Sequence, residues 1–182
     1  IETTFVSSVG PFVNLFEEKV AEAAGASHAV ATSAGTTGLH VALEAMGVGR
    51  NDLVVLPSFT FIASANAIAY CGASPWLFDI TEESWTLDPE LLDKHLATET
   101  HQEEGRLIHN ATGRRVAAVM PVYTLGMPAD MDAIVRIAKN YDLPVIADGA
   151  AALGATYKGR SSGKLGADLT VYSFNGNKTI TA

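Results

Sequence analysis

Three short segments of the chain carry side chains whose types and spacing could do chemistry, and each follows an apolar, β-branched run. The first is the turn 33–38, Ser-Ala-Gly-Thr-Thr-Gly. The second is the acidic end of Val-Ile-Ala-Asp at Asp148, and the third is the turn 173–178, which ends in Lys178. Open α/β sheets bind their ligands at the carboxyl ends of the strands. The three segments are therefore candidates for one common site.

The turn 33–38 consists of small residues and threonines and opens a helical pattern. Such a turn leaves backbone N–H groups unpaired at the positive end of a helix, which favours a phosphate, and the hydroxyls of Thr36 and Thr37 could add donors. The segment lacks the G-x-G-x-x-G pattern of dinucleotide sites, and the chain has no G-x-x-x-x-G-K-[ST] pattern. A purely structural connection is the alternative interpretation.

Asp148 allows three interpretations. A carboxylate at the end of a strand can cap the next helix, bind a metal ion, or pair with a protonated ring nitrogen of a cofactor. Residues 149–154 are glycines, alanines and one leucine, so they offer no second metal ligand. We therefore predict no metal at this site, while the helix cap and the ring-nitrogen partner both stay open.

Lys178 stands beside Asn177 and Thr179, with no acidic neighbour. A lysine that is unpaired and partly desolvated has a lowered pKa, and its neutral amine can form a Schiff base with a carbonyl; an ordinary surface lysine is the alternative. Pyridoxal phosphate (PLP) needs a phosphate seat, an acidic partner for its ring nitrogen and a lysine for its aldehyde. The three segments together predict this cofactor.

The elements that must position these residues alternate between short apolar runs and helical patterns, which is typical of βαβ units around a mainly parallel sheet. The pattern predicts strands over residues 28–32, 53–57, 75–79, 116–122, 145–148 and 169–174. It predicts helices over residues 13–24, 36–46, 60–70, 89–96 and 131–141, with Asp130 as the N-cap of the last. The polar stretch 99–115 is expected to be an exposed hairpin or loop.

Composition narrows the classes of partner. The 182 residues suit one domain. The net charge is -8, so the protein lacks the basic surface that nucleic-acid binding usually needs. No apolar run is long enough to span a membrane, and no signal segment precedes the first helix, so we expect a protein that is not inserted in a membrane. The single cysteine, Cys71, is interpreted as an inert buried thiol and favours the cytoplasm.

The motifs resemble the DegT/StrS-type family of PLP-dependent nucleotide-sugar aminotransferases, whose fold is of the aspartate-aminotransferase type. The matching stretches lie in the order typical of the family, at residues 33–40, 57–63, 128–132, 148–157 and 173–178. The resemblance implies an α/β fold with three layers, in which helices cover both faces of a mainly parallel sheet, as in the large domain of type I PLP-dependent transferases.

The resemblance also implies roles for single residues. Lys178 would hold the cofactor covalently and then move a proton between the cofactor and sugar carbons, and Asp148 would keep the pyridine nitrogen protonated. Phe61 would stack on the cofactor ring; a core position in the third helix is its alternative. The phosphate would be bound by Thr36, Thr37 and Ser173.

Two positions depart from the pattern that the resemblance implies. Ala151 counts among the cofactor-binding positions, but it stands where many relatives carry a glutamine near the cofactor's hydroxyl, so that contact is lost or replaced. Tyr123 stands where a histidine is common, and its role stays open. The retained Lys178 argues against the dehydrase branch of the family, which lacks this lysine.

The opening stretch 5–17 and the loop 105–115 look more like one subgroup, which acts on UDP-4-keto-6-deoxy-N-acetylglucosamine. The implied reaction transfers an amino group from glutamate to C4 of that sugar. A sugar 3-aminotransferase and a non-catalytic remnant that binds the cofactor or a partner chain are the alternatives. Because family members are roughly twice as long and form homodimers with shared active sites, we expect residues 1–182 to be an incomplete PLP-binding large domain without the C-terminal small domain.

Overall fold

The structure is a computed structural model that describes residues 10–181. Residues 5–9 of the opening stretch that carries the subgroup resemblance lie outside the described residues. The helices are α1 (Pro11–Ala24), α2 (Gly35–Ala45), α3 (Ile62–Tyr70), α4 (Pro89–Glu99) and α5 (Met131–Asn140), with 3-10 turns η1 (Thr124–Gly126) and η2 (Ser162–Lys164). The strands are β1 (Leu53–Pro57), β2 (Ser74–Phe78), β3 (Thr100–Glu103), β4 (Arg106–His109), β5 (Val116–Val119), β6 (Ile146–Asp148), β7 (Thr156–Tyr157), β8 (Arg160–Ser161) and β9 (Leu169–Val171).

The central sheet is parallel. The strands β2, β1 and β5 form one ladder, and β6 and β9 form a second. Two parallel bridges, Val119 with Val145 and Val122 with Asp148, join β5 to the β6 segment. The strand order is therefore β2-β1-β5-β6-β9, and the carboxyl ends of all five strands lie at one edge.

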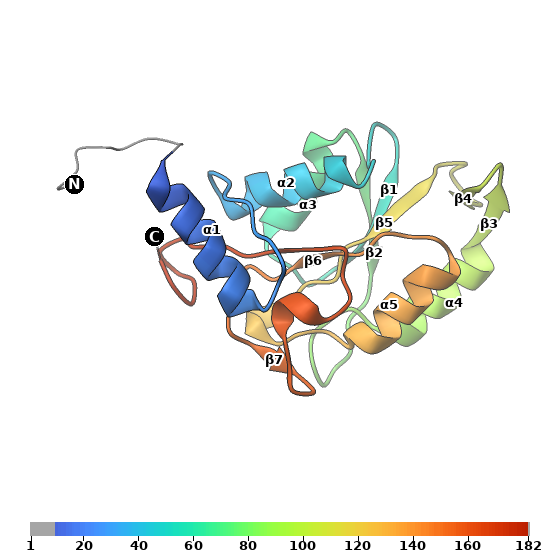
Figure 1. Ribbon diagram of the computed structural model, residues 1–182. Helices are drawn as coiled ribbons and strands as arrows, with labels where there is room; N and C mark the ends of the chain where they lie inside the picture. Colours follow the sequence, from blue (N-terminus) through green and yellow to red (C-terminus); the bar gives the residue numbers. More distant parts are fainter. Residues whose placement is uncertain (1–9, 182) are drawn as a thin grey trace.

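Helices cover both faces of this sheet (Figure 1). Along β1, Leu53 and Val55 belong to the core that includes residues of α4 and α5, whereas Val54 and Leu56 belong to the core of α2 and α3. Successive side chains of a strand point to opposite faces, so a continuous apolar run is what a doubly covered strand requires. The predicted α/β architecture with three layers is confirmed.

Aspartate side chains cap the N-termini of α4 and α5. Asp88 accepts hydrogen bonds from the N–H groups of Glu90 and Leu91 at the start of α4, and Pro89 occupies the first turn, where no N–H is needed. Asp130 accepts a hydrogen bond from the N–H of Ala133, which confirms it as the N-cap of α5. The capped helices α4 and α5 form the layer opposite α2 and α3.

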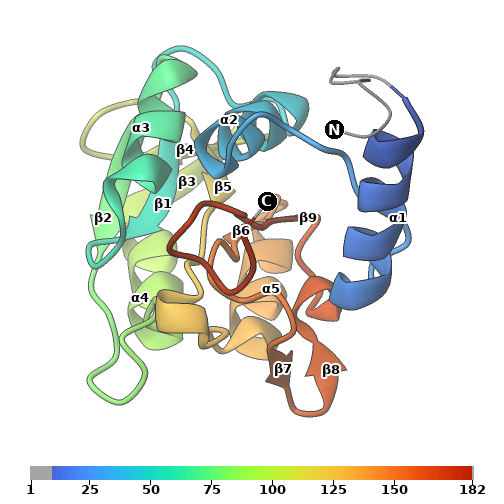
Figure 2. The same ribbon diagram turned by 90° about the vertical axis from the view of Figure 1, so that its left-hand side faces the viewer.

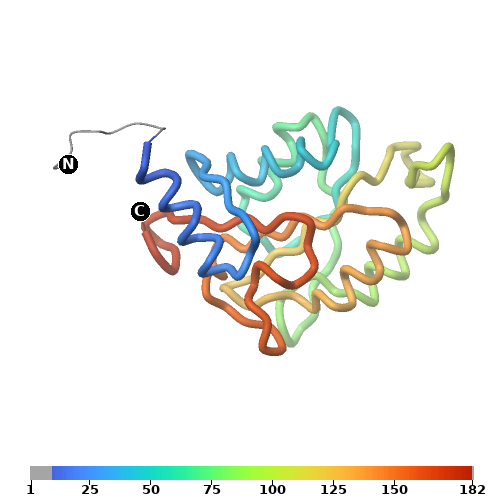
Figure 3. Tube along the Cα trace, in the orientation of Figure 1, coloured from blue at the N-terminus to red at the C-terminus, as the bar shows by residue number. Residues whose placement is uncertain are grey.

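The predicted strand over residues 28–32 is wrong. This segment is an irregular connection between α1 and α2 (Figure 3), in which Val30 is 81% exposed and the N–H of Ala31 donates to the carboxylate of Glu17. A β-branched run forms a strand only where a partner strand supplies the ladder. Within the described residues β9 ends the sheet on this side, and its outer edge pairs with no strand.

Two antiparallel hairpins complete the fold. The pair β3–β4 shows that the hairpin alternative for residues 99–115 is the correct one. The pair β7–β8 was not predicted; its turn, Lys158-Gly159, has positive φ at both positions, 49° and 76°, which is the signature of a tight hairpin turn. Among the described residues, no helix has the length and apolar character needed to cross a membrane.

Candidate cofactor site

The three candidate segments meet at the carboxyl edge of the sheet. The residues after β9 curl over this edge, between α2 and α3 on one side and α1 on the other (Figure 2). The chain leaves β1 toward β2 and leaves β5 toward β6, so the connections diverge between β1 and β5. Such a divergence point is where open α/β sheets bind ligands. The topology therefore brings the turn 33–38, Asp148 and the turn 173–178 to one place.

The N-terminus of α2 offers unpaired donors. Its N-cap, Ala34, provides no side-chain cap, and its carbonyl accepts its first helical hydrogen bond from Gly38. The N–H groups of residues 35–37 therefore remain free for a ligand. A Cβ on Gly35 would lie 3.0 Å from Cβ and 3.3 Å from Oγ of Ser173, so Ser173 packs directly against the helix start. Thr37 joins the same turn through a 3.2 Å hydroxyl contact with Ser33.

Asp148 is a buried carboxylate, 5% exposed, at the end of β6. Its Oδ2 accepts a 2.7 Å hydrogen bond from Oγ of Ser64, and its Oδ1 accepts a 3.1 Å bond from the N–H of Ala150. Buried carboxylates require such partners, because desolvation of the charge is otherwise costly. The helix-cap interpretation is wrong, because no α-helix follows Asp148 in the described chain; the residues after it form turns.

Lys178 and Phe61 lie near each other although 117 positions separate them in the chain. The ammonium nitrogen of Lys178 lies 5.8 Å from the ring centroid of Phe61. Lys178 is half-buried, and within residues 10–181 no carboxylate lies within ion-pair distance of it. Phe61 precedes α3 as its N-cap and is 71% exposed, so the core-residue interpretation is wrong and its ring is free to pack against a ligand.

Ala151 and Tyr123 are the two positions that depart from the family pattern, and neither side chain makes a polar contact in the described part of the site. The side chain of Ala151 cannot hydrogen-bond, but its carbonyl accepts a 3.1 Å bond from Oγ1 of Thr179, next to Lys178. Tyr123 is 2% exposed and belongs to the core under the sheet, and its hydroxyl has no hydrogen-bond partner among the described residues. Burial raises the pKa of Tyr123 far above its usual value, with a smaller contribution from Tyr172.

Sequence reasoning missed Ser64 and Thr179. Ser64 is fully buried and holds the carboxylate of Asp148, yet it lies 84 positions away in the chain. Thr179 links the segment after the lysine to the turn after β6. A signal for Ser64 exists in hindsight, since a serine within an alanine-rich apolar helix needs a buried partner.

The arrangement fits PLP. The phosphate would lie on the free N–H groups of α2 beside Ser173, where the absence of a Cβ at Gly35 allows the two segments to approach. The buried carboxylate of Asp148 would face the ring nitrogen, Phe61 offers an exposed aromatic face, and Lys178 offers an amine at the same edge. The donor set matches an anionic phosphate at one end and a protonated pyridine at the other.

Comparison with characterised proteins supports this assignment. The chain is 44% identical over 181 residues to GDP-perosamine synthase of Caulobacter vibrioides and 38% identical over 181 residues to GDP-perosamine synthase of Escherichia coli O157:H7. The matches cover 100% of this chain but only 44% and 45% of those relatives. The chain thus spans about half the length of the curated relatives it matches.

Solved structures show the same fold. The structure of 3-amino-5-hydroxybenzoic acid synthase matches with a TM-score of 0.81 and 36% identity, over 95% of this chain and 41% of that one. DesI, determined in the presence of its TDP-sugar product, matches with a TM-score of 0.81 and 33% identity, over 97% and 40% of the two chains. NtdA from Bacillus subtilis, with bound PMP as cofactor, matches with a TM-score of 0.78 and 28% identity, over 95% and 35%.

The family model gives the broadest match, because it extends over residues 1–182. With the cofactor-site geometry and the relatives in agreement, the chain belongs to the DegT/DnrJ/EryC1/StrS aminotransferase family.

Proposed function

We propose that this chain binds PLP through Lys178 and takes part in transfer of an amino group from glutamate to a keto carbon of a nucleotide-linked sugar. The observation that carries the proposal is the meeting of three groups at one edge: the uncapped start of α2 beside Ser173, the buried Asp148, and Lys178 beside Phe61. When bound, PLP supplies an electron sink for the carbon that gains or loses the amino group.

The fixed groups of the chain orient the cofactor. The N–H groups at the start of α2 and the hydroxyls of Thr36, Thr37 and Ser173 bind the phosphate, favoured by the helix dipole. Asp148 holds a proton on the ring nitrogen through charge and hydrogen bonding. Ser64 fixes the orientation of the Asp148 carboxylate from behind.

Lys178 performs the proton transfers. With PLP bound, the Lys178 amine would hold the cofactor through its aldehyde carbon and would serve as the base that moves a proton between carbons of the reacting groups. Its Nζ atom lies 5.8 Å from the centroid of the Phe61 ring, which supports a role beside the face on which the cofactor ring would stack. The net reaction converts glutamate and a keto sugar into 2-oxoglutarate and an amino sugar.

The substrate class is a nucleotide-linked keto sugar. The subgroup resemblance predicts a UDP-linked 4-keto-6-deoxy-N-acetylhexosamine, whereas the names of two relatives specify a GDP-linked amino sugar, perosamine. The relatives are 44% and 38% identical to this chain, so they favour a GDP-linked sugar as the first substrate to test.

Cofactor binding is tested separately from activity. The 182-residue protein, incubated with PLP and reduced with borohydride, should carry a pyridoxyl group on the peptide that contains Lys178, as seen by mass spectrometry. Lys178→Ala should lose the adduct, whereas Lys139→Ala, an exposed lysine of α5, should keep it. Equal labelling of the Lys178→Ala protein would contradict the assignment of the lysine.

Substrate and position are tested by incubating the PLP-loaded protein with glutamate and either the GDP-linked or the UDP-linked keto sugar. NMR of the product distinguishes amination at C4 from amination at C3. Amination at C3 would favour the sugar 3-aminotransferase. Cofactor binding without any amino transfer would favour the non-catalytic alternative.

We also propose that residues 1–182 belong to the cofactor-binding large domain and that two copies associate through an apolar edge patch. This edge patch consists of Phe59, Phe61, Ile62, Trp85, Leu125 and Met127, all exposed. Phe59 and Trp85 pack with ring centroids 5.7 Å apart, and the carbonyl of Trp85 accepts a hydrogen bond from Thr124, the neighbour of Leu125. Exposed apolar patches of this kind mark interaction surfaces.

The patch proposal is tested by the mass of the protein in solution. Leu125 is 85% exposed, so Leu125→Asp should reduce the dimer fraction in analytical ultracentrifugation without unfolding the chain. Val30→Asp, in the exposed connection between α1 and α2, is the matched control and should leave the dimer intact. An unchanged dimer in Leu125→Asp would exclude this part of the patch from the interface.

A further inference from the structure

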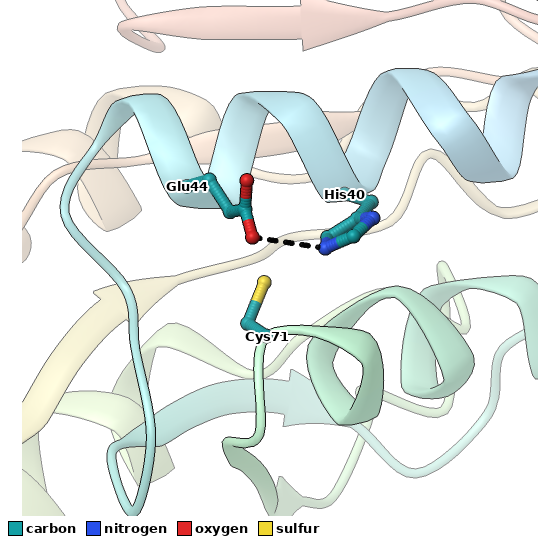
Figure 4. Close-up of side chains that lie close together, drawn as sticks. All are labelled: His40, Glu44 and Cys71. Atoms are coloured by element: carbon teal, nitrogen blue, oxygen red, sulfur yellow. Dashed lines mark ion pairs between the residues drawn. The ribbon is translucent and has the colours of Figure 1, made fainter.

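Three metal-ligating side chains gather on the outer layer of the fold, toward the carboxyl ends of α2 and α3 (Figure 4). His40 and Glu44 lie one turn apart on α2, and Cys71 follows the last residue of α3. One ligand atom of each residue lies within 4.8 Å of the others. Since α2 and α3 begin at the carboxyl edge of the sheet, this cluster lies at the other ends of the helices that help form the cofactor site.

His40 provides the observation that points to a ligand. Its Nε2 atom is buried and has no hydrogen-bond partner among the described residues. Oε1 of Glu44 is 3.2 Å from Nε2, within ion-pair distance, but the pair does not form a hydrogen bond. The His40 ring packs edge-on against the Tyr70 ring, with centroids 5.7 Å apart, and this contact restricts its rotation. Neutral imidazole is the commonest metal ligand in proteins, and the His40 ring is held here with no hydrogen bond to its Nε2 among the described residues.

Cys71 and Glu44 complete a mixed donor set. The Cys71 thiol is half-buried and makes one long contact, 3.4 Å, to the carbonyl of Ala67. The Glu44 carboxylate is mainly exposed and can turn toward the other two groups. The sequence interpretation of Cys71 as an inert buried thiol is wrong on burial, because the residue is only half-buried.

We propose that His40, Glu44 and Cys71 bind a divalent ion of the zinc class, with water completing a tetrahedral set. Imidazole, carboxylate and thiolate are the ligands that Zn²⁺ takes in proteins. At bond lengths of about 2.0–2.3 Å, tetrahedral ligand atoms lie about 3.5 Å apart. His40 Nε2 and Glu44 Oε1 are already 3.2 Å apart, so binding requires the Cys71 sulfur to come closer to them by about 1 Å through rotation of its side chain. A bound ion would clip α2 to α3.

The experiment uses Co²⁺ as a spectroscopic probe on the 182-residue protein without added PLP. Cys71 is the only cysteine in the sequence, so a thiolate-to-cobalt charge-transfer band in the near ultraviolet reports this residue alone. The band should saturate at one ion per chain, disappear in Cys71→Ser, and disappear when Zn²⁺ displaces Co²⁺. Zn²⁺ should also raise the Tm of the protein.

The partners of the thiol are tested by two further variants. His40→Gln and Glu44→Gln should each weaken Co²⁺ binding more than about tenfold, the lower bound for loss of even an outer-shell partner. His28→Gln, an exposed histidine outside the cluster, is the matched control and should leave the affinity unchanged. Circular dichroism shows whether each variant is folded. Absence of the band in the folded protein, or equal affinity in folded His40→Gln and Glu44→Gln, would overturn the site.

Discussion

Ser64→Ala tests whether the buried carboxylate at the centre of the site is held in place by a residue from another layer. The Oγ atom of Ser64 is fully buried and lies 2.7 Å from Oδ2 of Asp148, which is itself 5% exposed. A buried hydrogen bond to a charged group contributes about 1.5–3 kcal/mol, because its loss leaves the charge less well solvated. Ser64→Ala should therefore lower the free energy of unfolding by about that amount.

A double-mutant cycle separates this bond from the other contacts of Ser64, which include a 2.8 Å hydroxyl contact to Thr60. The free energy of unfolding is measured by urea denaturation for the parent, Ser64→Ala, Asp148→Asn and the double variant. The coupling energy should exceed about 0.5 kcal/mol, as for residues in direct contact. Ser162→Ala is the matched control, since Ser162 is also fully buried but bonds to the Ala152 carbonyl and the Tyr172 hydroxyl.

The refuting result is specific. If Ser64→Ala costs less than about 0.5 kcal/mol and is additive with Asp148→Asn, the short contact does not hold the carboxylate. The cofactor would then have to rely on Asp148 alone for its ring nitrogen. PLP affinity measured on the same variants shows whether the bond matters for binding, and we expect Ser64→Ala to bind PLP more weakly than Ser162→Ala does.

The remaining predictions concern the stability of the fold. Gly126→Ala should destabilise the protein in urea by more than Gly154→Ala does, because both glycines have positive φ but a Cβ at Gly126 would lie 2.8 Å from a backbone oxygen whereas none lies near Gly154. Leu92→Ala removes a fully buried side chain of α4 and should lower the free energy of unfolding by about 2–5 kcal/mol, with unchanged far-ultraviolet circular dichroism. Asp132 has a pKa below its usual value because of hydrogen bonding with Lys158. Asp132→Asn should therefore lower the stability of the protein by its full amount at pH values above the Asp132 pKa of the unfolded state. The difference between the variant and the parent should vanish as the pH falls through the Asp132 pKa of the folded state. Since both groups are exposed, added salt should shrink that loss, which pH-dependent thermal melts at two salt concentrations would measure.

Local sequence patterns predict most of the fold because the sheet is covered on both faces. The runs at β1 and β5 are apolar without interruption, as doubly buried strands require, and the N-cap of α5, Asp130, lies where expected. Residues 28–32 have the same local character and fail as a strand. Strand formation depends on a partner, which no local pattern contains.

Some residues of the candidate site can also be predicted from the local sequence, and others cannot. Asp148 ends β6, and Ser173 and Lys178 follow β9, so their place at the carboxyl edge of the sheet can be predicted from neighbours in the sequence. Ser64 cannot, because its bond to Asp148 joins residues 84 positions apart and depends on how α3 packs on the sheet. The sequence predicts Phe61 inside helix α3, but the residue lies just before the helix begins. A shift of one residue at a helix start changes the direction of the side chain, and the ring is exposed instead of lying in the core.

One part of the candidate site is buried and the other part is exposed, and the exposed part needs further protein to cover it. Asp148 and Ser64 are buried and cross-linked, whereas Phe61 is mainly exposed and Lys178 is half-buried. Proton transfer at a carbon adjacent to the cofactor proceeds better when water is excluded. In the proposed site the buried half would fix the cofactor ring, and the open half would need a cover that excludes water. Phe61 is itself part of the exposed edge patch, so the proposed second copy, seated on that patch, would supply the cover.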